Sequence, residues 1–340
     1  MKAVLFEQFG PAEKVLRIVR DAPEPPIGDN DVLIEVKATS VNPIDCAVRS
    51  GYGSAFFLRN GLMRMPLIPG RDISGIVRRV GSSVRRVKLG DHVYAGVPNF
   101  ATAAFAGVNE DWVAPMPTNL TFTQAAALPY AALTAWTALV DVVGLKPETA
   151  RGKRIIIPRG AGGVGSFAIQ LMKAWGAHVA SICSTRNVDL VKRLGADVVV
   201  DYTQTDFAEV LDDYDVAFDT AFDTEEKLLS ALKINAGAHY VSIVTPRFQF
   251  IDKYGLDEGQ KRGEAFLAER KRTQATLGRR YDWSFMRPNG AALAAIGKHV
   301  EAEEIRPLID SVYAMEDIAQ AHQLCESKQA RGKIVIEITP

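Results

Sequence analysis

The sequence predicts an α/β protein that combines a β-rich domain with a doubly wound parallel-sheet domain. Three observations support this class. A strand, a glycine turn and a helix follow one another over residues 154–177, strands and helices alternate after them, and short strands crowd the first third of the chain. At 340 residues the chain is longer than one ordinary hydrophobic core requires, so we expect two domains.

The segment 154–177 (RIIIPRGAGGVGSFAIQLMKAWGA) has the order that a dinucleotide-binding turn requires. A β-branched run predicts a buried strand, and Gly160, Gly162 and Gly165 follow in G-x-G-x-x-G spacing. Without a Cβ at Gly162 and Gly163, the backbone can approach a pyrophosphate, which the first N–H groups of the helix would face. A glycine turn that binds nothing is the alternative, and the flanking strand and helix argue against it. We expect cofactor contacts from Gly160, Ala161, Gly162, Gly163 and Val164.

The first third of the chain carries strand-like runs at residues 3–6, 32–38, 73–80 and 92–95, separated by glycine, proline and aspartate turns. This density of short strands is typical of a small barrel or sandwich. The apolar, alanine-rich segment 125–140 follows two prolines at the expected domain junction. It contains Pro129 and is shorter than the roughly 20 residues that span a bilayer, so we interpret it as a buried helix.

After the glycine turn, strands are predicted to alternate with helices. The strands are expected at 178–183, 198–200, 215–219 and 238–244, and the helices at 187–194 and 225–232. Such alternation predicts a parallel sheet whose ligand binds outside the carboxyl ends of the strands.

The turn after the second of these strands indicates which dinucleotide is bound. An NAD site places an acidic residue there to accept a hydrogen bond from the ribose 2′-OH. Here Ser184, Thr185 and Arg186 follow the strand, and no carboxylate comes before Asp189. Hydroxyls and a guanidinium suit the 2′-phosphate of NADPH. The alternative is that Arg186 is an ordinary surface arginine at a helix start.

Composition excludes several classes of protein. Lys+Arg and Asp+Glu both number 40, so no net charge favours binding to nucleic acid or to an anionic membrane. Cys46, Cys183 and Cys325 are too few and too scattered for a disulfide framework or a zinc cluster. The chain starts with a strand-like run that Glu7 interrupts before a signal-peptide core could form. We expect reduced thiols and a cytoplasmic protein.

Several stretches together resemble the medium-chain dehydrogenase/reductase superfamily, in its zinc-independent, quinone-oxidoreductase-like branch. They are SVNPIDCAVRSGYG (40–53), PLIPGRDISGIV (66–77), LGDHVYAGVP (89–98), AAALPYAALTAWTAL (125–139), RGAGGVGSFAIQLMKAWGAHV (159–179), LGADVVVDY (194–202) and ARGKIVIEI (330–338). NPID followed by RSGYG, GRDISG, MKAWGAHV and YVSIVTP are most similar to the reticulon-interacting mitochondrial oxidoreductases and their bacterial relatives.

The resemblance implies a GroES-like domain from residues 1–125, completed by 291–340, around a Rossmann domain from 126–290. It also implies NADPH as the cofactor and reduction of a quinone or another conjugated carbonyl.

The chain departs from the zinc-dependent alcohol dehydrogenases of the same superfamily. Where those enzymes carry cysteine and histidine ligands, this sequence has Asn42 and Arg71, which zinc sites do not use. Residues 96–112 also lack the four cysteines of the structural zinc site. We expect no metal, and therefore reduction of an acceptor that is already electrophilic.

Such an acceptor needs orientation, a dry pocket and a donor for the developing oxyanion. Asn42 and Tyr52 are the candidate catalytic residues, through an amide N–H and a phenol. Alternatively, Asn42 starts an Asn-Pro turn and Tyr52 packs on a loop. Zinc-independent quinone reductases often carry a tyrosine five residues after this asparagine, but here Ala47 stands there. We expect Asp45 to form a local ion pair with Arg49.

Three further cofactor contacts are expected by resemblance. Tyr202 would lie beside the adenosine half of the nucleotide, Thr245 near the nicotinamide, and Arg331 within reach of a phosphate. Ordinary loop structure is the alternative for each.

Two remaining segments could take part in association with other molecules. The basic segment 261–280 is interpreted as a solvated helix or a lid rather than as an RNA- or partner-binding patch, because acidic residues interrupt it. Tyr281, Trp283 and Phe285 alternate like an edge strand, which could pair across a two-fold axis to form a homodimer.

Two functions remain open. One is an NADPH-dependent reductase of quinones or, as a chemical variant, of the C=C bond of enals and enones. The other is a nucleotide-binding regulatory or interaction protein with little turnover, because no proton donor is obvious in the sequence.

Overall fold

The computed structural model describes residues 1–339, and the chain divides into two compact units. Unit 1 comprises Met1–Leu133 and Pro288–Pro340, and unit 2 comprises Thr134–Arg287. The expected boundaries, at 125 and 291, lie close to these. The first division falls within helix α5 (Pro129–Trp136). Because the helix continues across this division, the sequence carries no turn signal there.

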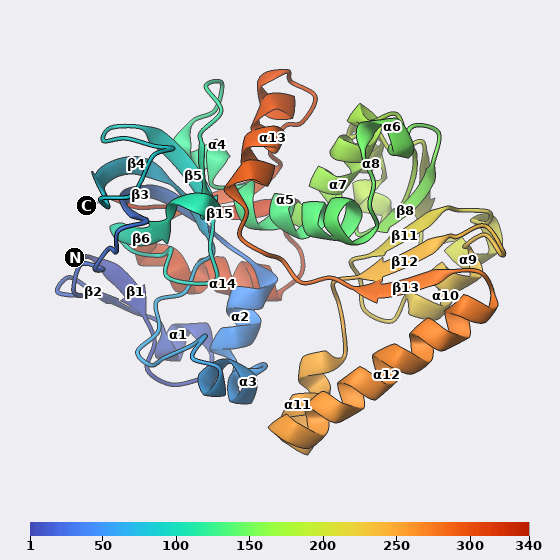
Figure 1. Ribbon diagram of the computed structural model, residues 1–340, viewed down its shortest axis with the longest axis horizontal. Coiled ribbons are helices and arrows are strands. Elements are labelled where there is room, and N and C mark those ends of the chain that lie inside the picture. Colours follow the sequence, from blue (N-terminus) through green and yellow to red (C-terminus); the bar gives the residue numbers. More distant parts are fainter. Residues whose placement is uncertain (340) are drawn as a thin grey trace. The chain divides into compact units, whose positions relative to one another are not determined.

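Unit 2 contains a parallel six-stranded sheet in the order β10-β9-β8-β11-β12-β13, of which Figure 1 labels β8, β11, β12 and β13. In chain order this is 3-2-1-4-5-6, the doubly wound arrangement that binds dinucleotides. The strands are β8 (Arg154–Pro158), β9 (His178–Cys183), β10 (Val198–Asp201), β11 (Val216–Asp219), β12 (His239–Ser242) and β13 (Arg280–Trp283). The helices are α6 (Pro147–Ala150), α7 (Gly163–Ala174), α8 (Val188–Arg193), α9 (Phe207–Val210), α10 (Glu225–Ser230), α11 (Arg247–Tyr254) and α12 (Leu256–Thr276).

Both faces of this sheet are covered, as the unbroken β-branched run of β8 predicts. Ile156 and Tyr240 belong to one apolar cluster with Leu228 of α10 and the partly buried Leu267 of α12. Successive residues of a strand point to opposite faces, so Ile155 and Ile157 face the other side, where α7 packs against β8 and β9.

Unit 1 is built on a seven-stranded sheet, counted over residues 1–339, in the order β14-β15-β3-β4-β5-β7 with β6 also paired to β3. β1 and β2 form a separate antiparallel pair. The strands are β1 (Ala3–Leu5), β2 (Arg17–Val19), β3 (Asp31–Val41), β4 (Asp72–Val80), β5 (His92–Gly96), β6 (Phe105–Asn109), β7 (Val113–Pro115), β14 (Ile309–Ala314) and β15 (Lys333–Glu337). The helices are α1 (Ala12–Val15), α2 (Pro43–Arg49), α3 (Ser54–Arg59), α4 (Phe122–Ala125), α13 (Gly290–Glu301) and α14 (Ile318–Glu326).

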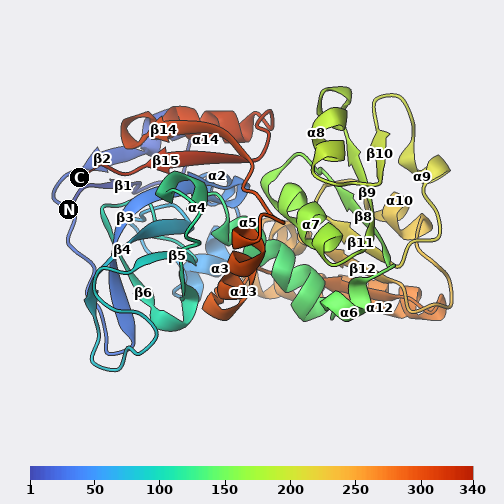
Figure 2. The same cartoon turned by 90° about the horizontal axis from the view of Figure 1, so that it is seen from above.

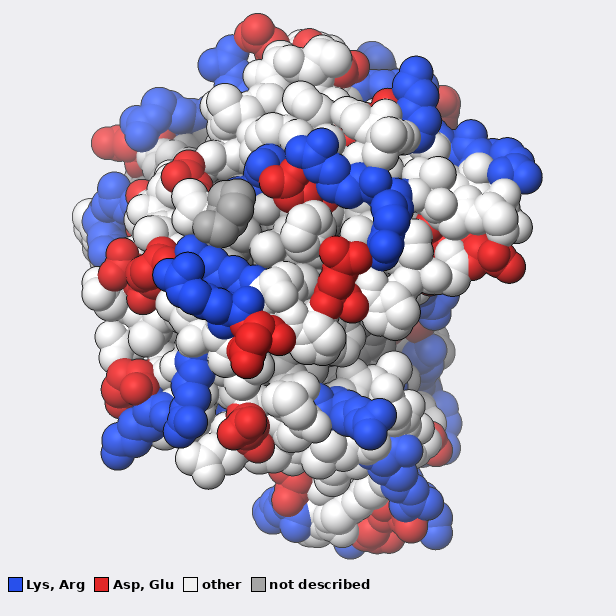
Figure 3. Space-filling view, turned by 90° about the vertical axis from the view of Figure 1, so that its left-hand side faces the viewer, with Lys and Arg blue, Asp and Glu red and all other residues white. Residues whose placement is uncertain are grey.

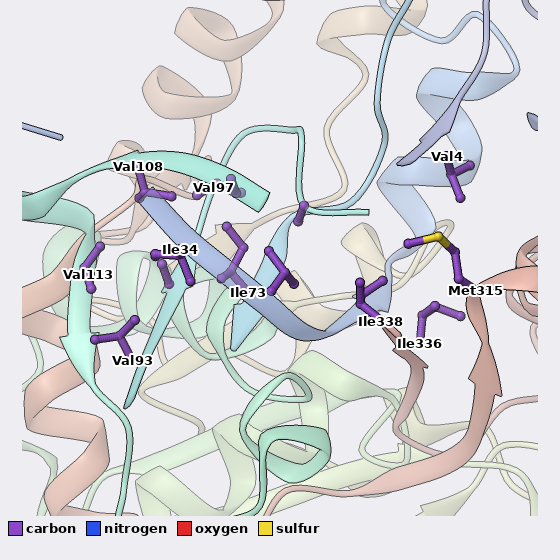
Figure 4. Close-up of a cluster of buried hydrophobic side chains, with 14 of the residues drawn as sticks. Val4, Ile34, Ile73, Val93, Val97, Val108, Val113, Met315, Ile336 and Ile338 are labelled. Carbon is purple, nitrogen blue, oxygen red and sulfur yellow. The ribbon is translucent and has the colours of Figure 1, made fainter. Parts of the chain in front are cut away.

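The last strand, β15, returns to lie antiparallel to β3, with Ile334 opposite Val41 (Figure 2). The core of unit 1 therefore takes side chains from both ends of the chain. Figure 4 shows Ile34 of β3 and Ile73 of β4 in one cluster with Ile336 of β15.

The residues from 42 to 49 form a helix that the sequence analysis missed. Asn42 caps α2, Pro43 occupies its first position, and the backbone N–H of Asn42 donates to the Asp45 carboxylate at 2.9 Å. A cap residue, a proline at the first position and an acidic residue three positions after the cap are signals of a helix start.

The predicted single helix at 125–140 is wrong in detail. Pro129 begins α5, and a π-helical turn at Thr137–Val142 continues it. The stretch Phe122–Val142 passes the length and composition test for a membrane span, but 72% of its most apolar window is buried inside the fold. The expected burial holds, as for the core helix of a globular domain.

The basic segment is helical, as expected, and forms most of α12. Its cations have acidic neighbours: Arg262 pairs with Glu258, and Lys271 with Asp282. Figure 3 likewise shows both signs of charge interspersed on the face that it presents. β13 is an edge strand of its sheet, as predicted, and the dimer that it could form stays a prediction.

Candidate functional site

The glycine turn of unit 2 connects β8 to α7, and its glycines differ in what they permit. A Cβ at Gly160 would lie 2.7 Å from Cδ1 of Ile169, and one at Gly165 would lie 3.0 Å from the Gly160 Cα. These two glycines are required for close packing of helix against strand. A Cβ at Gly162 would meet only the Arg159 carbonyl, at 3.3 Å, so this side of the turn is open.

The open side of the turn fits a pyrophosphate. Gly162 is the N-cap of α7 and provides no side chain to satisfy the first N–H groups of this 12-residue helix. Those N–H groups and the helix dipole favour an anion there. Ala161 is buried and Val164 is half-buried, beside the turn. The structure thus brings together the five residues from Gly160 to Val164 that the sequence singled out.

The turn after β9 holds the three predicted polar residues at the same edge of the sheet. Ser184 accepts a hydrogen bond from the Asn187 amide at 3.3 Å, Thr185 contacts Thr203 through their hydroxyls at 3.0 Å, and Arg186 is exposed. These side chains can reach a ligand at the carboxyl end of β9.

Asp201, the last residue of β10, is a neighbour that the sequence analysis missed. It lies opposite Cys183 in the sheet, and its carboxylate accepts hydrogen bonds from the Thr203 hydroxyl at 2.7 Å and the Thr203 N–H at 3.0 Å. A hydrogen bond from Thr185 is the main cause that lowers the pKa of Asp201. The turn therefore carries both a cation, Arg186, and a carboxylate. Asp201 comes close to this turn through the pairing of β10 with β9. Its distance in sequence from the glycines gave no sign of that proximity.

The other expected cofactor residues occupy separate places. Tyr202 is exposed, and its backbone N–H donates to the Cys183 carbonyl at 3.1 Å, so it lies beside the turn after β9. Thr245 is buried three residues beyond β12. Arg331 belongs to unit 1, where its backbone N–H donates to Asp310 at 2.8 Å.

Unit 1 contains a buried cluster of charged and polar side chains, the unit 1 polar cluster. Its members are Ser40, Asn42, Asp45, Arg71, Asp72 and Lys333, all buried. Arg71 pairs with Asp45 at 2.6 Å. Lys333 reaches Asp72 at 3.3 Å and also donates to the Asn42 amide oxygen. Two carboxylates therefore face two cations.

Asp72 is the centre of this network. One of its oxygens accepts from the Asn42 amide at 2.8 Å and from the Ser40 hydroxyl, and the other accepts from the Tyr130 backbone N–H at 2.6 Å. Tyr130 lies in the first turn of α5, where the helix dipole favours a carboxylate.

Burial raises the pKa of Asp45, and the positive charge of Arg71 opposes that rise. A buried carboxylate without such a partner would be costly. Burial also raises the pKa of Tyr130, whose ring lies 5.7 Å from the Arg71 guanidinium carbon. The Tyr130 phenol therefore keeps its proton at neutral pH and can donate it in a hydrogen bond.

Asn42 and Tyr52 lie at opposite ends of α2. Both polar atoms of the Asn42 side chain form hydrogen bonds. The amide nitrogen donates to Asp72 and, at 3.3 Å, to Asp45, and the amide oxygen accepts from Lys333. Tyr52 lies beyond the other end of α2, which separates the two by about 10 Å of helix rise. Their catalytic role stays a prediction, and the geometry favours Asn42 as an organiser of the cluster.

The expected Asp45–Arg49 ion pair is wrong. Asp45 pairs with Arg71, while the Arg49 side chain donates to the Gly10 carbonyl and pairs with Glu326. The sequence analysis placed Lys333, Arg71 and Asp72 within motifs of the family but did not predict that they belong to one cluster. A lysine starting the apolar run IVI was the available signal for Lys333.

A zinc ion does not fit this cluster. The positions at which related enzymes hold metal ligands carry an amide and a guanidinium, and both already bind Asp45 or Asp72. Among residues 1–339, no three His, Cys, Asp or Glu side chains are grouped as a metal site requires.

Replacing Lys333 with methionine should destabilise unit 1 strongly, because Asp72 would lose its buried cation. We expect the free energy of unfolding to fall by about 3–5 kcal/mol, measured by chemical denaturation. Lys298→Met, at an exposed position of α13, is the control and should change little. Equal losses for the two variants would contradict a special role for Lys333.

Comparison with known proteins places this geometry in a family. Residues 28–118 match the family described as the alcohol dehydrogenase GroES-like domain, and residues 194–336 match the family described as zinc-binding dehydrogenase. The second description includes a metal that the unit 1 polar cluster does not accommodate.

Individual relatives match over nearly the whole chain. A mouse protein named NAD(P)H oxidoreductase RTN4IP1, mitochondrial, is 39% identical over 99% of this chain and 89% of its own. The chloroplastic NADPH-dependent alkenal/one oxidoreductase of Arabidopsis thaliana is 31% identical over 100% of this chain and 80% of its own. The structure of the quinone oxidoreductase from Coxiella burnetii superposes with a TM-score of 0.81, at 32% identity, covering 100% of this chain and 99% of that one.

These relatives confirm the resemblance and correct the expected compartment. The expectation of a cytoplasmic protein is wrong, because the mouse protein and its zebrafish, cattle and human counterparts are named mitochondrial. Scattered cysteines and an early strand in place of a signal-peptide core, on which that expectation rested, say little about compartment. From its fold, its glycine turn and these relatives, the chain belongs to the medium-chain dehydrogenase/reductase superfamily, as an NAD(P)H-dependent oxidoreductase.

Proposed function

We propose that the protein transfers hydride from NADPH to a quinone or a similar conjugated carbonyl, without a metal ion. The observation that carries this proposal is the unit 1 polar cluster, in which Arg71 and Lys333 supply positive charge where related enzymes use zinc. The names of the Coxiella burnetii and Arabidopsis thaliana relatives support an electrophilic acceptor of this kind.

Unit 2 would hold the cofactor through its backbone and one polar turn. The N–H groups at the start of α7 would bind the pyrophosphate, and Ser184, Thr185 and Arg186 would bind the 2′-phosphate. The nicotinamide supplies the hydride when it is bound. Asp201 is a carboxylate beside this turn, and its repulsion of a phosphate limits the preference for NADPH over NADH.

Unit 1 would stabilise the negative charge that develops on the acceptor oxygen. The Tyr130 phenol is partly buried and stays protonated, and Arg71 lies over its ring. A neutral phenol whose ring lies near a guanidinium is a suitable donor to such an oxygen. Tyr130 thus fills the place of the proton donor that the sequence did not reveal. Asp45 and Asp72 would hold Arg71, Asn42 and the start of α5 in position.

The preference for NADPH can be tested at the turn after β9. Arg186→Ala should weaken NADPH binding by about tenfold or more, since a hydrogen bond to a charged group is lost, and should leave NADH binding nearly unchanged. Asp201→Asn should strengthen NADPH binding. Dissociation constants from a fluorescence titration would measure both changes. Equal loss for the two nucleotides in Arg186→Ala would show that Arg186 does not read the phosphate.

Tyrosine variants distinguish the two candidate donors. Tyr130→Phe should lower kcat by about 10²-fold or more, as for loss of an oxyanion donor, with unchanged NADPH binding. Tyr52→Phe is the matched control, and we expect its kcat to stay within a few-fold of the wild type. The reverse result would assign the role to Tyr52, as the sequence first indicated.

The acceptor is identified by anaerobic NADPH oxidation with a panel of quinones, alkenals and enones. Turnover on quinones supports the proposal. Turnover on alkenals or enones alone would make the protein a C=C reductase, the second candidate, which the Arabidopsis thaliana relative favours. Tight NADPH binding without turnover on any acceptor would overturn both in favour of a regulatory role.

A further inference from the structure

Helices α2 and α14 of unit 1 bring two thiols together. Cys46, on α2, is buried, and its sulfur lies 3.3 Å from Nδ1 of His322 and 3.7 Å from the His322 carbonyl oxygen. Cys325 follows His322 by three residues on α14, so both present side chains to the same neighbour. Cys325 packs against the apolar cluster that contains Cys46, and a hydrogen bond between the two thiols shifts both of their pKa values. Cys46 and Cys325 are 279 positions apart in sequence, so no motif spacing could have predicted that they lie close together.

The two thiols differ in the direction of their pKa shifts and in their exposure to solvent. The hydrogen bond from Cys46 lowers the pKa of Cys325, burial opposes that change, and the charge of Lys333 supports it. The same hydrogen bond and burial raise the pKa of Cys46. Cys325 is only half-buried, whereas Cys46 is enclosed. A half-exposed thiol with a lowered pKa thus lies next to a protected thiol, which is the arrangement of redox-sensitive pairs.

His322 holds the pair in place without taking up charge. Burial, with a contribution from the nearby Arg49, lowers the pKa of His322 to about 3. Its imidazole is therefore neutral at physiological pH and contacts Cys46 as a polar neighbour.

We propose that Cys325 and Cys46 form a peroxide-reactive site that closes to a disulfide between α14 and α2. In the first step the Cys325 thiolate attacks hydrogen peroxide. A sulfur–oxygen bond forms, the oxygen–oxygen bond breaks, and the departing hydroxide takes a proton to become water.

In the second step the Cys46 sulfur attacks the Cys325 sulfenic acid. The sulfur–sulfur bond forms, the sulfur–oxygen bond breaks, and the Cys46 proton leaves with the hydroxide as a second water. The two thiols together lose two hydrogens, and the peroxide is reduced to water.

This site takes no part in the proposed hydride transfer, but it lies close to residues of the unit 1 polar cluster. α2 starts at Asn42 and carries Asp45, and Lys333 adds to the charge around Cys325. A disulfide would join the helix that holds these residues to α14, which packs against it (Figure 1).

The test is peptide mapping by mass spectrometry under non-reducing conditions, after treatment of the folded protein with hydrogen peroxide. We expect a linked peptide that contains Cys46 and Cys325 in the wild type and in the control Cys183→Ser. Cys183 is a buried cysteine of unit 2. The map requires no acceptor or turnover, so its result is independent of the proposed function.

Single variants test the order of the two steps. In Cys46→Ser, a diketone probe should trap a sulfenic acid at Cys325, and in Cys325→Ser it should label nothing at Cys46. Cys46→Ala replaces Cys46→Ser if circular dichroism shows that the serine variant is unfolded. The proposal is overturned if the wild type gives no linked peptide, or if Cys325 proceeds to sulfinic acid while Cys46 stays reduced.

Discussion

The pairing of Asp72 with Lys333 is the constraint on which unit 1 depends. Asp72 starts β4 and Lys333 starts β15, so one buried ion pair joins the beginning of the fold to its end. The same carboxylate caps α5 and accepts from Asn42, which starts α2. Removing two charges from water costs several kcal/mol for each ion. The cost is offset here because each carboxylate oxygen of Asp72 and Asp45 has a donor. The positions of four elements, β4, β15, α2 and α5, are fixed as a result.

Under the proposed function, the unit 1 polar cluster would take the place of the metal ion that the description of the zinc-binding dehydrogenase family implies. A zinc ion brings two positive charges into a dry site and orients what it binds. In this chain Arg71 and Lys333 bring two positive charges to the unit 1 polar cluster, held by Asp45 and Asp72. Under the proposed function these cations would not ionise an alcohol but would favour negative charge on a carbonyl oxygen. Their presence is consistent with an acceptor that is already electrophilic.

Local patterns predicted the sheet of unit 2 well, because its strands other than β13 contain apolar runs next to a turn or a helix. β9 was predicted at the observed residues, 178–183, and the glycine turn occupies its expected place. Pairings between distant segments could not be predicted. Asp201 reaches the turn after β9 only through sheet register, and Lys333 reaches Asp72 only through the return of β15. Arg49 was assigned to Asp45, four residues away, yet pairs with Glu326 across the fold.

The return of β15 to β3 also sets an order of events during synthesis. Unit 2 is one continuous segment, and all of it has been made before residue 288 is added. Unit 1 lacks β15, and with it the cation for Asp72, until the ribosome has added residue 333. Until β15 has been made, β3 exposes the edge that β15 will cover, and the Asp72 carboxylate lacks its cation. The β-rich unit therefore completes its fold only after β15 has been made, and until then it is the unit that a chaperone would have to protect.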